Sequence, residues 1–169
     1  GKEAEWRERI RRLLDWAGAN QAVPTTGPKG EPIEKLEILR YASGQSLYVG
    51  YVLDREEAAK ARTTFPAEGH VYDMRMGKYL GRGRTFDITL PGRDALMLAF
   101  LPYRVRGIEV KVVAAQRGSE AEVTVSLQAS SPPGLHVFRV EVLGPDGQAV
   151  DALAQNLLVE GGKAQGRIP

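Results

Sequence analysis

The stretch spanning residues 70–102 constrains the fold of this chain more than any other, because turn signals divide it into short apolar segments. Within it, residues 86–90 alternate apolar and polar side chains, which is the period of a half-buried strand. Gly81 and Gly83 are expected to break the strand that comes before. The stretch therefore predicts four antiparallel strands, at residues 71–74, 79–80, 86–90 and 95–101.

The last of these segments, ALMLAFL at residues 95–101, is apolar throughout. It is too short to span a bilayer, and it is typical of a strand that is buried on both faces. A helix is the competing interpretation. The strand is favoured because only turn signals flank the segment, with no helical amphipathic pattern around it.

Composition narrows the class of protein. The 169 residues carry a formal net charge of +2, which argues against a strongly basic nucleic-acid binder. Cysteine is absent, which excludes disulfides and thiolate metal sites. The charged N-terminus does not have the apolar core of a signal peptide, and no run approaches the roughly 20 apolar residues of a membrane span. We therefore expect no nucleic-acid partner and no membrane span.

Residues 1–20 are predicted to form an amphipathic docking helix. Its apolar positions fall on one stripe at helical spacing: Trp6, Ile10, Leu13, Leu14 and Ala17. Acidic residues precede basic residues by four positions, and each such pair stabilises a helix by roughly a few tenths of a kcal/mol. A basic membrane-surface element is the functional alternative. Docking onto a neighbouring domain is favoured because the acidic residues are interleaved with the basic ones.

The prolines and glycines of residues 21–32 predict an extended linker. A hairpin is expected to follow, with strands at residues 36–41 and 47–53. Together with the stretch at residues 70–102, this hairpin predicts an antiparallel β-sandwich domain at residues 33–103.

Residues 104–169 show a cleaner alternation of apolar and polar side chains, which predicts strands around residues 108–112, 122–127, 138–142 and 152–159. Strand length and spacing are typical of an immunoglobulin-like β-sandwich. Because such a sandwich usually has about seven strands in about 100 residues, this one is expected to be incomplete. Strand exchange with a second copy of the chain would then supply the missing strands. The predicted fold class is mainly β: an N-terminal amphipathic helix, an antiparallel β-sandwich domain and an immunoglobulin-like β-sandwich.

Patterns that would indicate catalysis are weak. His70 and His136 are the only histidines, and neither has a second histidine at ligand spacing, so no metal and no cofactor is expected. No serine lies on a nucleophile-elbow motif. The acidic residues Asp54, Glu56 and Glu57 are interpreted as a solvated turn rather than as a catalytic carboxylate pair.

The glycine-rich segment at residues 77–83 resembles a phosphate-binding loop only superficially, because it lacks the order GxxxxGK[ST] and no helix is expected after it. Several basic residues lie around it: Arg75, Lys78, Arg82, Arg84 and Arg93. Basic residues with stacking aromatics can bind nucleic acid. Asp73, Asp87 and Asp94 dilute this patch, so a nucleic-acid interface is not favoured.

Tyrosines are the candidate ligand-binding residues. An aromatic ring can lie against the apolar face of a sugar ring, and four tyrosines of the first predicted domain are candidates for this role: Tyr48, Tyr51, Tyr72 and Tyr79. The alternative is that they are half-buried strand residues, because tyrosine is enriched in strands. An exposed row of these rings on one sheet face would favour carbohydrate binding, and their burial would favour a structural role.

The run HVYDMRMGKYLGRGRTFDITLPGRDALMLAFLP resembles the C-terminal β domain of bacterial β-galactosidase-like glycoside hydrolases of the family 42 type. WRERIRRLLDWAGANQAV is similar to the helix that leads into that domain, and EILRYASGQSLYVGYVLD is similar to its first hairpin. The run HVFRVEVLGPDGQAVDALAQNLLVEGGKAQGRIP resembles an immunoglobulin-like module of large bacterial extracellular proteins. In the glycoside hydrolase family the two catalytic glutamates lie in a barrel domain, which no part of this chain resembles.

This resemblance implies non-catalytic accessory β domains of a larger glycoside hydrolase that is secreted or part of the cell envelope. The expected partners are the other domains of that protein, and the chain itself is not expected to be an enzyme. The main alternative is a carbohydrate-binding module that uses its tyrosines. A homodimer formed by strand exchange is also expected.

Overall fold

The computed structural model describes residues 5–6, 8–10, 12–13, 23–113 and 120–168. The chain is mainly β, as the sequence predicts, with a curled antiparallel sheet and two further small sheets. By its contacts the chain divides into two compact units. The first contains residues 1–37, 52–68 and 83–95, and the second contains residues 38–51, 69–82 and 96–169. The linear domain boundaries expected from the sequence stay a prediction.

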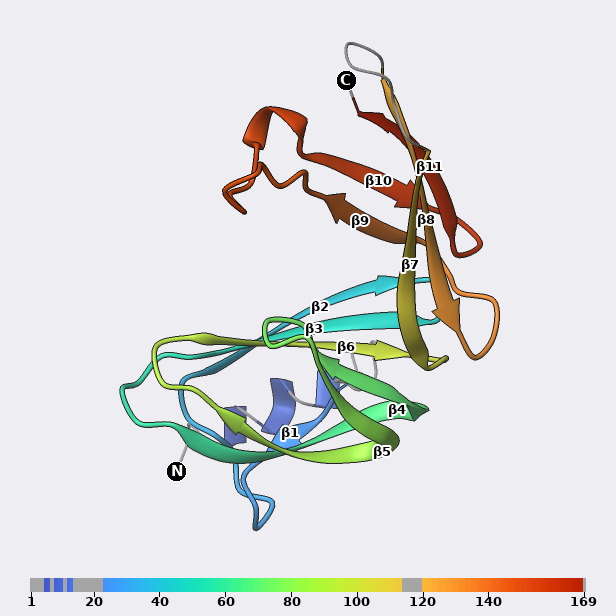
Figure 1. The fold of residues 1–169 in the computed structure, drawn as a ribbon. Coiled ribbons are helices and arrows are strands. Elements are labelled where there is room, and N and C mark those ends of the chain that lie inside the picture. The colour runs from blue at the N-terminus through green and yellow to red at the C-terminus, as the bar shows by residue number, and fades with distance from the viewer. Residues whose placement is uncertain (1–4, 7, 11, 14–22, 114–119, 169) are drawn as a thin grey trace. The chain divides into compact units, whose positions relative to one another are not determined.

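The large sheet contains six strands in the order β1-β4-β6-β3-β2, with β5 paired to β4 (Figure 1). Their bounds are β1 (Thr25–Thr26), β2 (Leu36–Ser43), β3 (Ser46–Leu53), β4 (Ala59–Asp73), β5 (Lys78–Leu90) and β6 (Ala95–Leu101). The predicted hairpin at residues 36–53 is confirmed as β2 and β3. The strand interpretation of ALMLAFL is also confirmed, and its residues 98–101 are buried in succession, as expected for a strand covered on both faces.

Two of the predicted strand breaks are wrong. β5 runs through both Gly81 and Gly83 without interruption. β4 likewise continues through Pro66, although proline is unusual inside a strand. Gly81 has φ +134, a conformation that glycine adopts at low cost, so the strand continues where other residues would be strained. Pro66 is exposed. Residues 70–102 therefore contain the end of β4, the whole of β5 and β6, where the sequence predicted four separate strands.

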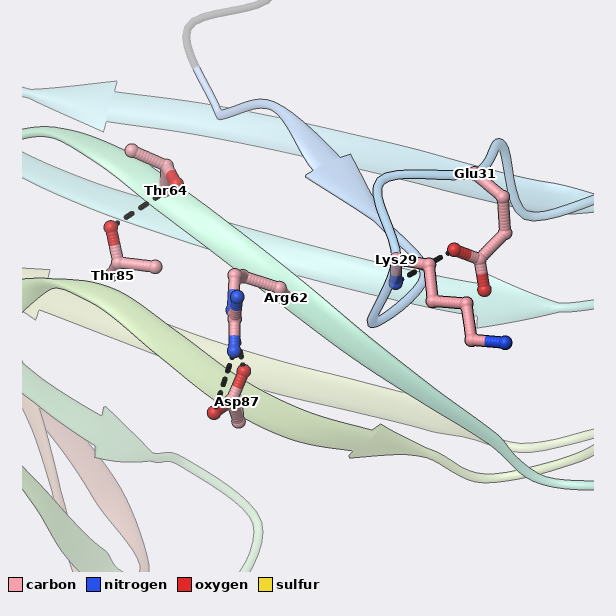
Figure 2. Close-up of polar contacts among 6 residues, drawn as sticks. All are labelled: Lys29, Glu31, Arg62, Thr64, Thr85 and Asp87. Carbon is pink, nitrogen blue, oxygen red and sulfur yellow. Dashed lines mark hydrogen bonds and ion pairs between the residues drawn. The ribbon is translucent and has the colours of Figure 1, made fainter.

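In the first unit, the exposed face of β4 and β5 carries a ladder of polar pairs across the two strands. Nε of Arg62 lies 2.8 Å from Oδ1 of Asp87, and the hydroxyls of Thr64 and Thr85 are 3.3 Å apart (Figure 2). On the alternate positions of β4, Ala61, Thr63 and Phe65 are buried. This alternation favours a strand at these residues, because in a strand successive side chains point to opposite faces, here one toward the core and one toward water.

In the second unit, Gly69 of β4 is required by a close approach. A Cβ atom at this position would collide with the ring of Phe100 and with the carbonyl oxygen of Leu101. Both neighbours belong to β6, which pairs with β4 through His70 and Leu101. The absence of a side chain at Gly69 therefore lets the Phe100 ring pack directly on the β4 backbone.

The C-terminal part of the second unit contains five strands in two sheets, a three-stranded sheet of order β11-β8-β7 and a hairpin of β9 and β10. Their bounds are β7 (Val105–Val113), β8 (Ala121–Ala129), β9 (His136–Val140), β10 (Gln155–Val159) and β11 (Lys163–Ile168). The sequence prediction missed β11, and it began the strand at residues 152–159 too early, because Asp151–Leu153 forms a short 3₁₀ helix and β10 starts at Gln155. The core between these sheets contains the buried residues Val123, Val125, Leu157 and Ile168.

The described residues near the N-terminus are helical, and two of the expected acid–base pairs are present, between Glu5 and Arg9 and between Glu8 and Arg12. The side chains of Trp6, Ile10 and Leu13 are exposed, however. The expected burial of this stripe is therefore not found in the described part of the chain, because an amphipathic pattern specifies a face but supplies no partner surface. Docking onto a neighbouring domain stays a prediction, and Leu14 and Ala17 of the stripe lie outside the described residues.

Within the described ranges, no helix has the length and hydropathy that crossing a bilayer requires.

Candidate functional site: a tyrosine and histidine cluster

The predicted tyrosines do not form an exposed row. Tyr51 is 1% exposed, and Tyr48, Tyr72 and Tyr79 are half-buried. Tyr41 is the most accessible tyrosine at 67% exposed, and its ring centroid lies 6.2 Å from that of Tyr48. The four residues expected to bind a ligand are therefore divided among different environments, and their role in binding stays a prediction.

Two of these tyrosines are brought together by the turn between β4 and β5. Oδ1 of Asp73 accepts hydrogen bonds from the backbone N–H groups of Arg75 and Met76, both at 3.0 Å, and Gly77 follows with φ +59. Such a turn folds the chain back on itself. It sets the ring centroids of Tyr72 and Tyr79 5.0 Å apart, at an interplanar angle of 45°.

The two hydroxyl groups of this pair are both occupied. Oη of Tyr79 lies 2.8 Å from Nδ1 of His70. Oη of Tyr72 accepts the backbone N–H of Val105 at 2.8 Å and donates to the carbonyl oxygen of the same residue at 3.4 Å. The polar ends of both rings therefore contribute to the internal structure of the second unit.

The segment that follows β6 is held from a second side. The backbone N–H of Arg104 donates to Oγ of Ser130 at 2.9 Å, and the N–H of Ser130 donates to the carbonyl oxygen of Arg104, also at 2.9 Å. The guanidinium carbon of Arg104 lies 5.1 Å from the ring centroid of Tyr79. This distance allows a cation–π interaction, so the backbone and the side chain of Arg104 are both restrained.

Tyr103 anchors the same segment in the core. The residue is buried, and its Oη accepts the N–H of Gly134 at 3.1 Å. Nε2 of His136 is the second hydrogen-bond partner of this hydroxyl, and which of the two atoms donates depends on the imidazole tautomer. We call the whole group the tyrosine–histidine cluster: His70, Tyr72, Tyr79, Tyr103, Arg104 and His136.

The environment of the cluster disfavours charge on its imidazoles. Burial lowers the pKa of His70, and the positive charges of Arg82 and Arg104 lower it further. Burial also lowers the pKa of His136. For Tyr72, burial raises the pKa of the phenol. All three directions favour the neutral forms of these side chains.

Sequence reasoning placed the two histidines in separate domains and gave neither a tyrosine partner. His70 and Tyr72 are two positions apart on one strand, which puts them on the same face, and the predicted turn at residues 75–78 brings Tyr79 across from them. That local signal could have identified the first half of the cluster. The pairing of Tyr103 with His136 joins residues far apart in sequence and had no local signal.

The remaining sequence candidates are spread over the surface. Asp54, Glu56 and Glu57 are exposed, as expected for a solvated turn. Among the basic residues, Arg93 pairs with Glu56 at 3.1 Å, and Nε of Arg84 donates to the carbonyl oxygen of Phe65. In the described residues, no group of three or more His, Cys, Asp or Glu side chains could hold a metal ion.

Two surface hollows lie outside the cluster. In the first unit, a hollow of about 460 Å³ is lined by segments 27–34 and 55–60, and it includes Arg55. Nε of Arg55 is buried without a hydrogen-bond partner among the described residues. In the second unit, a hollow of about 290 Å³ lies over residues 122–124 of β8 and 165–167 of β11. Neither hollow contains a predicted ligand-binding tyrosine.

Comparison with known proteins identifies no relative. No protein-family model, no curated protein and no solved structure matches this chain. The resemblance to glycoside hydrolases of the family 42 type stays a prediction.

Proposed function

We propose that this chain is a non-catalytic, structural β region of a larger β-galactosidase-like glycoside hydrolase, secreted or attached to the cell envelope. Its role is to hold neighbouring domains or subunits in position. The observation that supports this proposal is the occupation of the tyrosine hydroxyls, because Tyr72, Tyr79 and Tyr103 all make internal hydrogen bonds. Hydroxyl groups used in this way tie the rings to the chain itself and are not free to bind a ligand.

The tyrosine–histidine cluster holds one short segment, residues 103–105, from several directions. Tyr103 is bonded through its side chain, Arg104 through its backbone and its guanidinium, and Val105 through its backbone. A structural region needs such a restraint where one β segment continues into the next, because a flexible connection would not fix the positions of the segments that it joins.

Limited proteolysis tests the holding role directly. Trypsin cleaves after arginine, and Arg104 and Arg106 lie within or beside the held segment. Cleavage requires local opening of the backbone. The Tyr72→Phe variant loses a hydrogen bond worth about 1–2 kcal/mol, so cleavage there should be about 5- to 30-fold faster than in the unaltered chain. The Tyr41→Phe variant is the matched control and should be cleaved at the unaltered rate.

An activity assay tests the non-catalytic part. The purified chain should show no turnover of aryl galactosides or other aryl glycosides above buffer. Turnover that disappears on changing one aspartate or glutamate would refute the structural role.

In the proteolysis experiment, equal rates of cleavage of the Tyr72→Phe variant and the unaltered chain would show that the cluster does not hold this segment.

A carbohydrate-binding module is the second candidate, and one observation favours it. The exposed ring of Tyr41 lies beside the half-buried ring of Tyr48, which provides an accessible aromatic surface on β2 and β3. Calorimetric titration with galacto-oligosaccharides would detect binding. Binding that is abolished by Tyr41→Ala and retained in Tyr79→Ala would favour this second candidate over the structural role.

A further inference from the structure

The outer edge of β7 has no strand beside it in the described part of the chain. β7 is the last strand of the sheet β11-β8-β7, so only one of its edges is paired, through β8 (Figure 1). Its apolar side chains are also open to solvent: Ile108, Val110 and Val112 are 55%, 57% and 60% exposed. An exposed apolar edge strand presents unpaired N–H and C=O groups and is a template for another strand.

The exposed apolar row belongs to the inner face of the sheet. In the register of β7 with β8, Val110 is opposite Val125 and Val112 is opposite Val123. Residues directly opposite each other point to the same face of a sheet. Val123 and Val125 are almost fully buried in the core, so the row on β7 continues the core-facing surface to the sheet edge, where its side chains become exposed.

The charges of β7 lie on its other face. Glu109 and Lys111 alternate with the apolar row, and their side chains form an ion pair at 3.2 Å within the strand. A second β7 placed antiparallel, with Val110 opposite Val110, would put each Glu109 opposite a Lys111 and each Ile108 opposite a Val112. Opposite charges across a strand pair are favourable, and like charges are unfavourable.

The neighbouring registers are worse. Centring the pair on Glu109 sets two glutamates opposite each other, and centring it on Lys111 sets two lysines opposite each other. A shift by one residue would place charged side chains opposite apolar ones. Among these registers, only the one centred on Val110 is self-complementary, and this complementarity favours a second copy of the same strand as the partner.

We propose that two copies of this chain associate through antiparallel pairing of their β7 strands about Val110, which joins the two three-stranded sheets into one continuous sheet. The contact is isologous, because the same surface of each copy is used. It is independent of the proposed structural function and of the tyrosine–histidine cluster. A single strand pair buries a small area, so the dimer should dissociate on dilution.

Charge reversal tests the register. Sedimentation velocity of the full chain over a dilution series should show a monomer–dimer equilibrium. Glu109→Lys alone and Lys111→Glu alone each set like charges opposite each other at two places, and each should weaken dimerisation by about tenfold or more. The double variant E109K/K111E restores opposite charges and should dimerise like the unaltered chain.

Mixing the two single variants gives the sharpest result. In the mixed dimer every Lys faces a Glu, so the mixture should associate about as tightly as the unaltered chain, although each variant alone associates about tenfold or more weakly. Lys163→Glu, on β11 at the other edge of the same sheet, makes the same charge change as Lys111→Glu and should leave dimerisation unaltered. Thermal unfolding checks that all variants fold. A chain that stays monomeric at its highest soluble concentration, or a dimer unaffected by the single reversals, would overturn the proposal.

Discussion

The phenolic oxygen of Tyr72 accepts the backbone N–H of Val105 at 2.8 Å, and its hydroxyl donates to the carbonyl oxygen of the same residue at 3.4 Å. One side chain thereby satisfies both backbone groups of the first residue of β7. The ring is half-buried, so water would not fully replace the hydroxyl as the partner of these two backbone groups if the hydroxyl were removed.

The Tyr72→Phe variant should therefore lower the free energy of unfolding by about 1–2 kcal/mol, because it leaves the part-buried backbone of Val105 without its partner. Urea denaturation followed by circular dichroism measures this loss. The Tyr41→Phe control removes a hydroxyl from an exposed ring and should change stability by less than about 0.5 kcal/mol. Equal effects at the two positions would mean that the hydrogen bonds of Tyr72 contribute nothing.

Stability should fall as the pH falls below the ordinary pKa of histidine, about 6.5. Burial lowers the pKa of both His70 and His136 in the folded chain, so the unfolded chain binds these protons first as pH falls. Each neutral imidazole makes its full contribution to the free energy of unfolding at pH values above the ordinary pKa. As the pH falls from that value to the lowered pKa of the folded state, this contribution is lost.

Thermal unfolding between about pH 7.5 and 5.5 measures this loss, in a range where most carboxylates stay ionised. In the His136→Gln variant the midpoint should fall less over the same range than in the unaltered chain, because one titrating group is removed. An unchanged pH dependence in this variant would contradict a lowered pKa of His136 in the folded chain.

Replacing Gly69 with alanine should destabilise the chain by about 1–3 kcal/mol, because the added Cβ collides with the Phe100 ring and the Leu101 backbone. Gly83 is the matched control within β5. A Cβ there would meet its nearest neighbour, the Phe86 ring, at 3.6 Å, which is ordinary contact. Gly83→Ala should be neutral or slightly stabilising. Denaturant midpoints of the two variants, compared side by side, check this expectation.

The adjacent leucines of β10 provide an internal test of which face is buried. Leu157 is 8% exposed and lies in the core, whereas Leu158 is 63% exposed. Leu157→Ala should cost about 2–5 kcal/mol, and Leu158→Ala less than about 0.5 kcal/mol. If the two losses were similar, or their order reversed, the register of β10 would be shifted by one residue.

The sequence by itself determined where most strands lie and which of their faces is apolar. Two strand-like segments on either side of a turn identified the hairpin of β2 and β3, and alternation identified β7 and β8. An unbroken apolar run identified β6. These signals are local, because the period of two follows from the backbone of a single strand and from the burial of one face.

Only the tertiary structure decided how those strands continue and what they contact. β4 passes through Pro66 and β5 passes through Gly81, although both residues locally favour a break, because the neighbouring strands fix the extended backbone. The hydrogen bonds from Tyr72 to Val105 and from Tyr103 to His136 join residues more than 30 positions apart. Such contacts depend on strand order and register, which arise when distant segments pair, and no local pattern of side chains specifies them.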